Sequence, residues 1–414
     1  MPERNRLDST CCIIGLGYIG LPTAAVLARA GHRVIGVDVN AQVVCTVNQG
    51  QIHIVEPDLD QAVADTVASG ALSAQLTPAP ADVFLIAVPT PFRSGVAGIP
   101  EPNIDYVLSA ARAIAPVLQP GNLVLLESTS PVGTTEQVAQ VIGELSGLNS
   151  EQLHIAYCPE RVLPGRILQE LISNDRVIGG LTPVAAEAGK AFYATFCQGE
   201  LLATTARTAE LVKLTENSFR DVNIAFANEL SLVCDRLGIN VRELIRLANH
   251  HPRVNVLQPG CGVGGHCIAV DPWFIAAEAP DCTPLIQTAR RVNDGKSRWV
   301  IEQVQARAAA LEEQLGRPAR IGCLGLAFKP DVDDLRESPA LHITTELLVA
   351  GLEVLACEPN LHDHPTIKLH SLEQVLADAD LLVFLVAHTP FRCLDLTGRT
   401  VFDLCGVTEQ DGPL

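Results

Sequence analysis

Apolar runs and glycines near the start of the chain follow the order of a strand, a turn, a helix and a second strand. Residues 11–15 form a short apolar run, typical of a buried strand. A helical stretch over 21–30 ends at Gly31, and residues 33–38 form the next apolar run. Further strands are expected at 83–88, 123–126 and 154–157. Strands that alternate with helices predict a doubly wound parallel sheet.

The same plan returns near the C-terminus. Residues 321–325 resemble the first strand, 351–360 repeat the pattern of 31–40, and 380–391 repeat that of 82–92. Glu358 then stands in the place of Asp38. Three repeats in one order predict a second Rossmann-like domain. Because it lacks the third glycine of the first copy, we expect it to bind a nucleotide differently, or to bind a ligand other than a dinucleotide.

Two long helical patterns lie between these regions, over 208–237 and 287–315. In the first we expect core contacts from Leu211, Leu214, Val222, Ala225 and Phe226. The predicted fold class is α/β, with two Rossmann-like doubly wound parallel-sheet domains joined by a central helical region. The expected domains are 1–203, which binds a dinucleotide, 204–301, which is helical and a place for subunit contacts, and 302–414.

Composition narrows the class of protein. The 414 residues are 48% hydrophobic and 18% charged, which excludes a disordered chain. A net charge of −18 argues against nucleic acid or an anionic membrane as a partner, and no apolar run reaches the ~18 residues of a membrane-spanning helix. Thirteen cysteines, odd in number and irregular in spacing, indicate reduced thiols and a cytoplasmic protein.

Gly15, Gly17 and Gly20 stand between the first strand and the first helix, in the G-x-G-x-x-G spacing. Such glycines let a pyrophosphate approach the backbone at a helix N-terminus. Asp38 lies 18 residues beyond Gly20, where a carboxylate can accept hydrogen bonds from a ribose diol and repels a 2′-phosphate. The alternative is a glycine-rich turn without a ligand. The spacing predicts binding of NAD rather than NADP.

A second glycine-rich segment, residues 260–271, contains Cys267. If a helical turn begins there, the thiol lies near a helix N-terminus, which lowers a thiol pKa, and Asp271 follows on the same face. A structural cysteine is one alternative. A zinc site of Cys261, His266 and Cys267 is another, but it lacks the second ligand pair, so we expect no metal. The other twelve cysteines are expected to be ordinary thiols.

Lys213, Asn217 and Arg220 fall within a ~60° arc of the first long helix. The lysine and the asparagine could donate hydrogen bonds to a developing oxyanion, or the three could be a solvated polar stripe. Glu160 follows a strand and could orient water, with a surface ion pair as the alternative.

Loops at strand ends and cations in other loops complete the candidate site. The hydroxyl-rich loop 127–135 and the loop 88–91 both follow strands, where such folds bind ligands. His251 and Arg253 lie in one loop, and a second loop runs from Phe328 and Lys329 to Arg336. The cations of these two loops suit a diphosphate.

These motifs together, in order and over nearly the whole chain, resemble the UDP-glucose/GDP-mannose dehydrogenase family. The motifs that carry the resemblance are the Gly15 fingerprint, Pro159-Glu160-Arg161, Lys213-x-x-x-Asn217, the glycine loop with Cys267 and Asp271, Phe328-Lys329 and Arg336-Glu337-Ser338. Four runs are similar to members that oxidise UDP-N-acetyl-D-mannosamine: residues 56–59, 213–229, 251–255 and 262–274.

The resemblance implies a four-electron oxidation of a sugar C6 alcohol to a carboxylate with two NAD⁺, for surface polysaccharide synthesis. Cys267 would form a thiohemiacetal and then a thioester. Lys213 and Asn217 would stabilise oxyanions, and Asp271, Glu160 and Thr129 would position and activate water. The implied NAD contacts are Gly15, Gly17, Tyr18, Ile19, Gly20, Asp38, Thr90, Thr129 and Arg336. The implied contacts of the nucleotide sugar are Arg161, Val162, Lys213, Asn217, Arg220, His251, Arg253, Gly264, Phe328 and Lys329.

The resemblance also implies a homodimer, with Arg253 reaching the neighbouring subunit's site. Its implied substrate is UDP-N-acetyl-D-mannosamine, with UDP-N-acetylglucosamine or UDP-glucose as alternatives, because such sugars differ by a few pocket contacts. A one-step NAD alcohol dehydrogenase and a non-catalytic NAD-binding sensor are the competing hypotheses; neither has a use for Cys267 in a glycine loop. The sequence departs from the family's pattern at Cys261, where proline or another small residue is usual.

Overall fold

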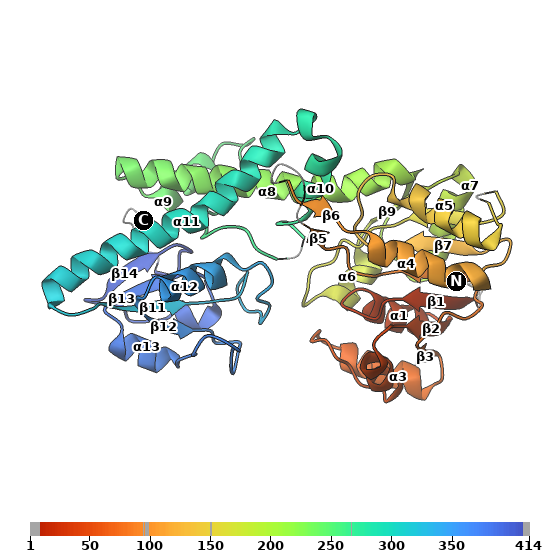
Figure 1. The fold of residues 1–414 in the computed structure, drawn as a ribbon, viewed down its shortest axis with the longest axis horizontal. Coiled ribbons are helices and arrows are strands. Elements are labelled where there is room, and N and C mark those ends of the chain that lie inside the picture. Colours follow the sequence, from red (N-terminus) through yellow and green to blue (C-terminus); the bar gives the residue numbers. More distant parts are fainter. Residues whose placement is uncertain (1–8, 94, 96–98, 150, 266, 409–414) are drawn as a thin grey trace. The chain divides into compact units, whose positions relative to one another are not determined.

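The computed structural model describes residues 9–93, 95, 99–149, 151–265 and 267–408 (Figure 1). The chain divides into two compact units, Met1–Thr215 and Glu216–Leu414. No helix in the described ranges is both long and apolar enough to cross a membrane.

The first unit is built on an eight-stranded sheet in the order β10-β9-β8-β7-β4-β1-β2-β3. Every neighbouring pair is parallel except β8 and β9, which are antiparallel. The strands are β1 Thr10–Ile14, β2 Arg33–Val37, β3 Leu72–Gln75, β4 Val83–Ile86, β7 Leu123–Leu126, β8 His154–Tyr157, β9 Arg176–Gly180 and β10 Leu201–Thr205. The predicted doubly wound sheet is therefore confirmed, with one antiparallel pair that the sequence pattern did not indicate. A two-stranded ribbon of β5 Phe92–Arg93 and β6 Glu101–Pro102 was also not expected.

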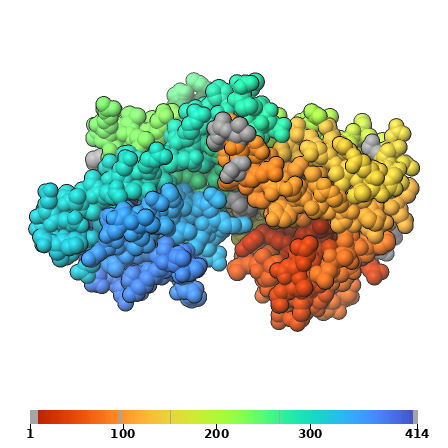
Figure 2. Space-filling model, in the orientation of Figure 1, coloured from red at the N-terminus to blue at the C-terminus, as the bar shows by residue number. Residues whose placement is uncertain are grey.

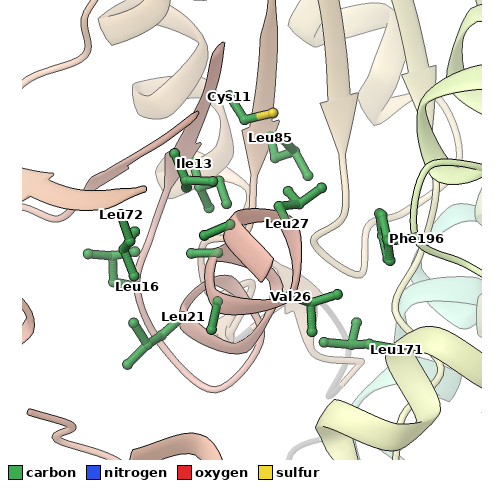
Figure 3. Packing of buried hydrophobic residues seen from close by; sticks show 14 of the residues in the cluster. Cys11, Ile13, Leu16, Leu21, Val26, Leu27, Leu72, Leu85, Leu171 and Phe196 are labelled. Carbon is green, nitrogen blue, oxygen red and sulfur yellow. The ribbon is translucent and has the colours of Figure 1, made fainter. Parts of the chain in front are cut away.

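Helices cover both faces of this sheet, because alternate residues of each strand point to opposite sides. Cys11 and Ile13 of β1 pack with one set of helices, and Cys12 and Ile14 pack with another. Figure 3 shows the first of these cores, where side chains of β1 and α1 meet. The space-filling view shows α4 and α5 together on the outer surface, in orange and yellow (Figure 2). The helices are α1 Gly20–Arg29, α2 Ala41–Asn48, α3 Leu59–Ala68, α4 Asp105–Ile114, α5 Thr134–Ser146, α6 Ile167–Ser173 and α7 Pro183–Tyr193.

Helix α8, Ala206–Leu237, contains the division between the units, and its longer part belongs to the second. The second unit continues with α9 Val241–Ala248, α10 Asp271–Glu278 and α11 Pro284–Leu315. Both long helices are confirmed. Of the core contacts expected from α8, Leu214 and Ala225 are buried, but Leu211 and Phe226 are 43% and 52% exposed, so that prediction was wrong for these two.

The second unit ends in a four-stranded parallel sheet in the order β12-β11-β13-β14. Helices α11 and α12 pack on one face of it and α13 on the other. The remaining elements are β11 Arg320–Leu324, α12 Pro339–Val349, β12 Glu353–Cys357, α13 Leu372–Asp378, β13 Leu381–Phe384 and β14 Thr400–Asp403. The predicted second Rossmann-like sheet is thus present.

The repeat between the two sheets extends to single hydrogen bonds. Gly15 N donates to the last residue of β2, and Gly325 N donates to the last residue of β12. Both glycines have positive φ, at 94° and 91°. Asp38 accepts a hydrogen bond from the backbone of Leu16, and its counterpart Glu358 accepts one from the backbone of Leu326. The proposed correspondence of Asp38 and Glu358 is therefore correct.

Candidate active site

The glycine fingerprint lies at the turn from β1 into α1. A Cβ on Gly20 would come within 1.8 Å of the carbonyl oxygen of Gly15, and one on Gly15 within 2.6 Å of Ala87 O, so both positions need glycine for packing. A Cβ on Gly17 would meet nothing within 4 Å, so its backbone faces open space. That is the geometry a pyrophosphate needs, because the N–H groups at the start of α1 can be reached. Tyr18 and Ile19 lie in the same turn, and Tyr18 is 37% exposed.

Asp38 is held at the end of β2 by two backbone N–H groups. Its Oδ2 accepts from Leu16 N at 3.0 Å, and its Oδ1 accepts from Asn40 N at 2.9 Å. A carboxylate has about four acceptor positions, so both oxygens retain capacity for a ribose diol. The residues of the first unit therefore fit NAD, whose nicotinamide supplies a hydride acceptor when bound.

Other predicted residues of the first unit also follow strands of the parallel part of the sheet. Thr90 follows β4, Thr129 follows β7, and Glu160, Arg161 and Val162 follow β8. The carboxyl ends of parallel strands meet at one edge, so the fold brings these loops to the edge where the fingerprint lies. Arg161 donates to the carbonyl of Asp175 at 3.2 Å, which ties its side chain to the segment before β9.

The hydroxyl-rich loop is mostly a structural element. Ser128 bridges Ile86 O and Val88 N, and Ser130 and Thr134 donate to carbonyls within the loop. Buried Glu210 accepts hydrogen bonds from Thr135 Oγ1 and from two N–H groups at the start of α5, at 2.6–2.8 Å. Burial raises the pKa of Glu210 more than these bonds lower it. These bonds show which hydroxyls support the loop itself, and half-buried Thr129 stays the predicted ligand contact of the loop.

Glu160 lies in a buried group of polar side chains, which we call the acid cluster: Glu127, Cys158, Glu160, Arg176 and Tyr193. Arg176 contacts Glu160, with 2.9 Å between Nη1 and Oε1, and both side chains are buried. The alternative of a surface ion pair is therefore wrong: the pair exists, but in the interior. Tyr193 donates to Glu127 Oε1 at 2.7 Å, and the Arg176 guanidinium lies 4.6 Å from the Tyr193 ring centroid.

In the second unit, Cys267 begins a helical turn just before α10. Its carbonyl accepts from Val270 N at 3.0 Å and from Asp271 N at 2.8 Å, and α10 itself begins at Asp271. The thiol is thus one turn ahead of the helix proper, and its residue is half-buried. Asp271 is buried, and its Oδ2 accepts from Asn217 Nδ2 at 2.5 Å. The carboxylate therefore connects the thiol segment to α8.

Asn217 is buried on α8, and Lys213, also buried, precedes it by four residues, about one helical turn. Because both side chains are buried, Lys213 and Asn217 are not part of a solvated polar stripe. Arg220 is exposed, in contrast, as are His251 and Arg253 in the segment after α9.

The glycine loop that leads to Cys267 is fixed by two buried side chains. Asn228 of α8 accepts from Gly260 N at 2.9 Å, and Ser297 of α11 donates to Cys261 O at 2.8 Å. Asn228 also donates to Asn293 Oδ1 at 2.9 Å, which joins the two long helices. The helices thus determine where the thiol loop begins.

The far side of the same loop packs on the segment after β11. A Cβ on Gly264 would lie 2.5 Å from Glu337 O and 2.9 Å from Phe328 Cβ, so only glycine fits. Gly265 N donates to Arg336 O at 3.1 Å. Lys329 Nζ lies 5.8 Å from the Phe328 ring centroid, and the Arg336 side chain pairs with Asp334. The predicted substrate residues Gly264 and Phe328 are therefore neighbours. Arg336, predicted to contact NAD, lies in the second unit.

Several polar residues of these groups were not found from the sequence: Glu127, Arg176, Tyr193, Glu210, Asn228, Asn293 and Ser297. Glu127 could have been noticed, because it stands between a buried strand and the hydroxyl run. The zinc alternative includes His266, which lies outside the described residues. Cys261 is buried and its Sγ contacts Leu385 O at 3.5 Å, and burial raises the pKa of its thiol to about 12.

A glycine fingerprint followed by an acid at the end of β2, a second Rossmann-like sheet and a thiol loop between them in sequence are typical of an NAD-dependent dehydrogenase. The sequence matches three domains of one family: the NAD binding domain over residues 9–197, the central domain over 207–295 and the UDP binding domain over 322–410. The chain belongs to the UDP-glucose/GDP-mannose dehydrogenase family, and its cofactor is NAD. The family resemblance is thereby confirmed.

Relatives and solved structures agree with this family. The chain is 56% identical to the UDP-N-acetyl-D-mannosamine dehydrogenase of Escherichia coli K12, over 94% of this chain and 95% of that protein. It is 52% identical to the NDP-N-acetyl-D-galactosaminuronic acid dehydrogenase of Ralstonia nicotianae, over 96% of both. A native structure of the UDP-N-acetyl-mannosamine dehydrogenase of Staphylococcus aureus superposes with a TM-score of 0.86, at 41% identity over 97% of this chain and 96% of that one.

Proposed function

We propose that the protein oxidises the C6 alcohol of UDP-N-acetyl-D-mannosamine to the carboxylate in two NAD-dependent steps, through a thiohemiacetal and a thioester on Cys267. The observation that carries the proposal is the link between the thiol segment and α8. Asp271 bonds the Cys267 carbonyl through its backbone and Asn217 through its side chain. The backbone of the thiol residue, an amide and a carboxylate are thereby linked to one another, and covalent catalysis depends on such support of the nucleophile.

The chain's own residues have distinct parts in this proposal. When bound, NAD would supply the hydride acceptor for each oxidation. Lys213 and Asn217 donate hydrogen bonds to the oxygen at C6 as negative charge develops there. Cys267 attacks the aldehyde carbon, so the aldehyde stays bound and the second oxidation yields a thioester. Glu160, Asp271 and Thr129 position and deprotonate the water that releases the acid.

The ratio of NADH formed to sugar consumed tests the two-step reaction. We expect two NADH per UDP-N-acetyl-D-mannosamine, measured by absorbance with limiting sugar. One NADH per sugar would instead support the one-step alcohol dehydrogenase, and NAD binding without turnover on any nucleotide sugar would support a non-catalytic sensor.

Replacing the thiol separates covalent catalysis from simple oxidation. Cys267→Ser should abolish formation of the uronate, because a serine hydroxyl is a weaker nucleophile and would give an oxygen ester, which water attacks less readily than a thioester. Cys282→Ser is the matched control, since Cys282 is an exposed cysteine of the same unit, and this variant should retain full turnover. Normal uronate production by Cys267→Ser would refute the role of the thiol.

The sugar is proposed from the relatives, and a panel of nucleotide sugars decides it. UDP-N-acetyl-D-mannosamine should give the highest kcat/KM. The competitors are UDP-N-acetylglucosamine, UDP-glucose and the N-acetylgalactosamine nucleotide suggested by the Ralstonia relative. A higher kcat/KM for any of these would replace the proposed substrate while leaving the chemistry unchanged.

We also propose a homodimer that forms through α8. Phe219, Phe226 and Val233 follow one another at intervals of seven residues, so they share one face of the helix. They are 68%, 52% and 47% exposed, and an exposed apolar stripe of this kind marks an interface. Sedimentation should give a dimer for the native chain and a folded monomer for Phe226→Glu. A dimer that persists in the variant would place the interface elsewhere.

The cell compartment and the pathway are proposed on chemical grounds. None of the thirteen cysteines, all of which lie in the described ranges, forms a disulfide, which favours a reducing compartment such as the cytoplasm. A nucleotide-activated uronate is a donor for glycosyl transfer, so we propose that the product supplies surface polysaccharide synthesis. Loss of the uronic acid from surface polysaccharide in a strain without the gene would support this, and unchanged sugar composition would refute it.

A further inference from the structure

The acid cluster contains a second carboxyl that the proposed reaction does not use. Glu127 follows β7 and Glu160 follows β8, and these strands are neighbours in the sheet. Both side chains are buried, at 2% and 8% exposure, together with one guanidinium, Arg176. With both carboxyls ionised, the cluster would hold an uncompensated negative charge. Such a charge is costly in a buried place, so one of the two carboxyls should retain its proton.

The contacts decide which carboxyl that is. Glu160 has a direct ion pair with Arg176, at 2.9 Å. Glu127 instead accepts a hydrogen bond from the neutral phenol of Tyr193, at 2.7 Å. An ion pair stabilises the charged form of a carboxylate more than a phenol does. Glu127 is therefore the member that holds the proton.

The balance of the effects on Glu127 agrees with this assignment. Burial is the main cause that raises the pKa of Glu127 to about 7, and the neighbouring Glu160 adds to it. Arg176 from β9 and Tyr193 from α7 lower that pKa by smaller amounts. Cys158, at the end of β8, has a thiol pKa that burial raises to about 12, so it is neutral.

Arg176 connects the two carboxyls physically. Its Nη1 bonds Glu160, and its guanidinium lies over the ring of Tyr193, whose hydroxyl bonds Glu127. When Glu127 ionises, two carboxylates interact with the single positive charge of Arg176. Arg176 then holds the Glu160 carboxylate less tightly.

We propose that Glu127 is a positioning residue for Glu160: while it is protonated it leaves Arg176 to hold Glu160, and once it is ionised it attracts the same cation and frees the Glu160 carboxylate to accept the proton of the attacking water. This inference rests on the proposed function. In the step concerned, the water oxygen bonds C6 of the thioester and Glu160 takes one water proton. The C6–S bond breaks with its electron pair on the Cys267 sulfur, and the new carboxylic acid releases the second proton to solvent.

The rate of thioester hydrolysis as a function of pH tests the proposal. Enzyme in excess is mixed with NAD and UDP-N-acetyl-D-mannosamine, and the mass of the covalent adduct is followed by intact-protein mass spectrometry. In the native enzyme the decay of the adduct should speed up as pH rises through about 7, the value to which burial and Glu160 raise the pKa of Glu127. In Glu127→Gln this rise should be absent. The variant should decay about threefold to tenfold more slowly than the native enzyme at about pH 8.5.

Two further variants separate positioning from packing. Glu127→Asp keeps an ionisable group and should restore the rise with pH. Glu210→Gln removes another buried carboxyl of the same unit, which bonds the start of α5, and it should leave the pH profile unchanged. The two NADH formed in the first turnover should be the same in all variants, because the oxidations precede hydrolysis.

The outcomes are distinct. An unchanged pH profile in Glu127→Gln, with normal adduct formation, overturns the role of Glu127 and leaves the proposed function intact. A native enzyme that forms no adduct and no NADH overturns the proposed function itself. If Glu127→Gln does not fold, the native profile alone decides, because a decay rate that is constant from about pH 6 to about pH 8.5 contradicts an ionisation of Glu127 in that range.

Discussion

Asn228 offers the sharpest test of how the two long helices position the thiol loop. Its side chain is completely buried and makes two hydrogen bonds, from Gly260 N to its Oδ1 and from its Nδ2 to Asn293 Oδ1, both 2.9 Å. Asn228→Ala would leave a backbone donor and a buried amide oxygen without these partners. Each such group costs about 1–3 kcal/mol, so the free energy of unfolding of the second unit should fall by about 2–6 kcal/mol.

Urea unfolding followed by tryptophan fluorescence measures this loss directly. Both tryptophans, Trp273 on α10 and Trp299 on α11, belong to the unit that contains Asn228. Asn223→Ala is the control, since within the described residues the Asn223 side chain donates to Phe219 O one turn back in its own helix. This variant should change stability by about 0.5 kcal/mol or less.

The same variant should also lower kcat, because the first residue of the loop that leads to Cys267 loses its anchor. We expect kcat for NADH formation to fall more than KM rises, since the loop positions the nucleophile. An Asn228→Ala protein that matches the Asn223→Ala control in both stability and kcat would refute the idea that these helices fix the thiol.

Three other changes test the burial of single groups. The pKa of Glu127 is raised from 4.5 to about 7, so the native protein should lose up to about 3 kcal/mol of stability as pH rises across that interval, and Glu127→Gln should remove this loss in thermal unfolding. Lys296 is buried, which lowers its pKa from 10.5 to about 7. The free energy of unfolding should therefore increase by at most about 5 kcal/mol as pH rises from about 7 to about 10.5, and Lys296→Met should remove most of this increase. Gly264→Ala should cost about 1–3 kcal/mol and most of kcat because its Cβ collides with Glu337 O, whereas Gly295→Ala on α11 meets nothing and should stabilise by about 0.5–1 kcal/mol.

Local patterns determined the elements well. The predicted strands 123–126 and 154–157 coincide with β7 and β8, because short apolar runs between breakers have few other structures available. The antiparallel pairing of β8 with β9 was not predicted, since a buried strand has the same apolar pattern in either direction. The exposure of Phe226 on α8 was also missed. A periodic apolar face indicates burial, but it does not say whether the chain itself or another molecule buries it.

The site could be predicted where its residues are close in sequence. Asp38 follows its glycines by a fixed spacing, and Asp271 lies one turn from Cys267, so both positions were expected. The ion pair of Glu160 with Arg176 was not predicted, because Arg176 belongs to a different strand. Nothing in the apolar pattern of that strand indicates that its arginine contacts a carboxylate. Buried polar groups with distant partners need the tertiary structure to be seen.

The comparison of Asp38 with Glu358 explains why the two halves of the repeat need not bind the same ligand. Asp38 receives two hydrogen bonds from the backbone and keeps acceptor positions for a ribose. Glu358 receives hydrogen bonds from two backbone N–H groups at the turn after β11, from Asn360 and from His388 Nε2 at 3.0 Å. Burial raises the pKa of Glu358, but the bonds from His388 and Leu326 more than offset this, so its carboxylate is ionised and fully engaged within the protein. Asp38 of the first copy therefore keeps acceptor positions for a ribose, whereas Glu358 of the second copy uses its carboxylate for hydrogen bonds within the protein. A ligand of the second sheet has to be recognised by other groups.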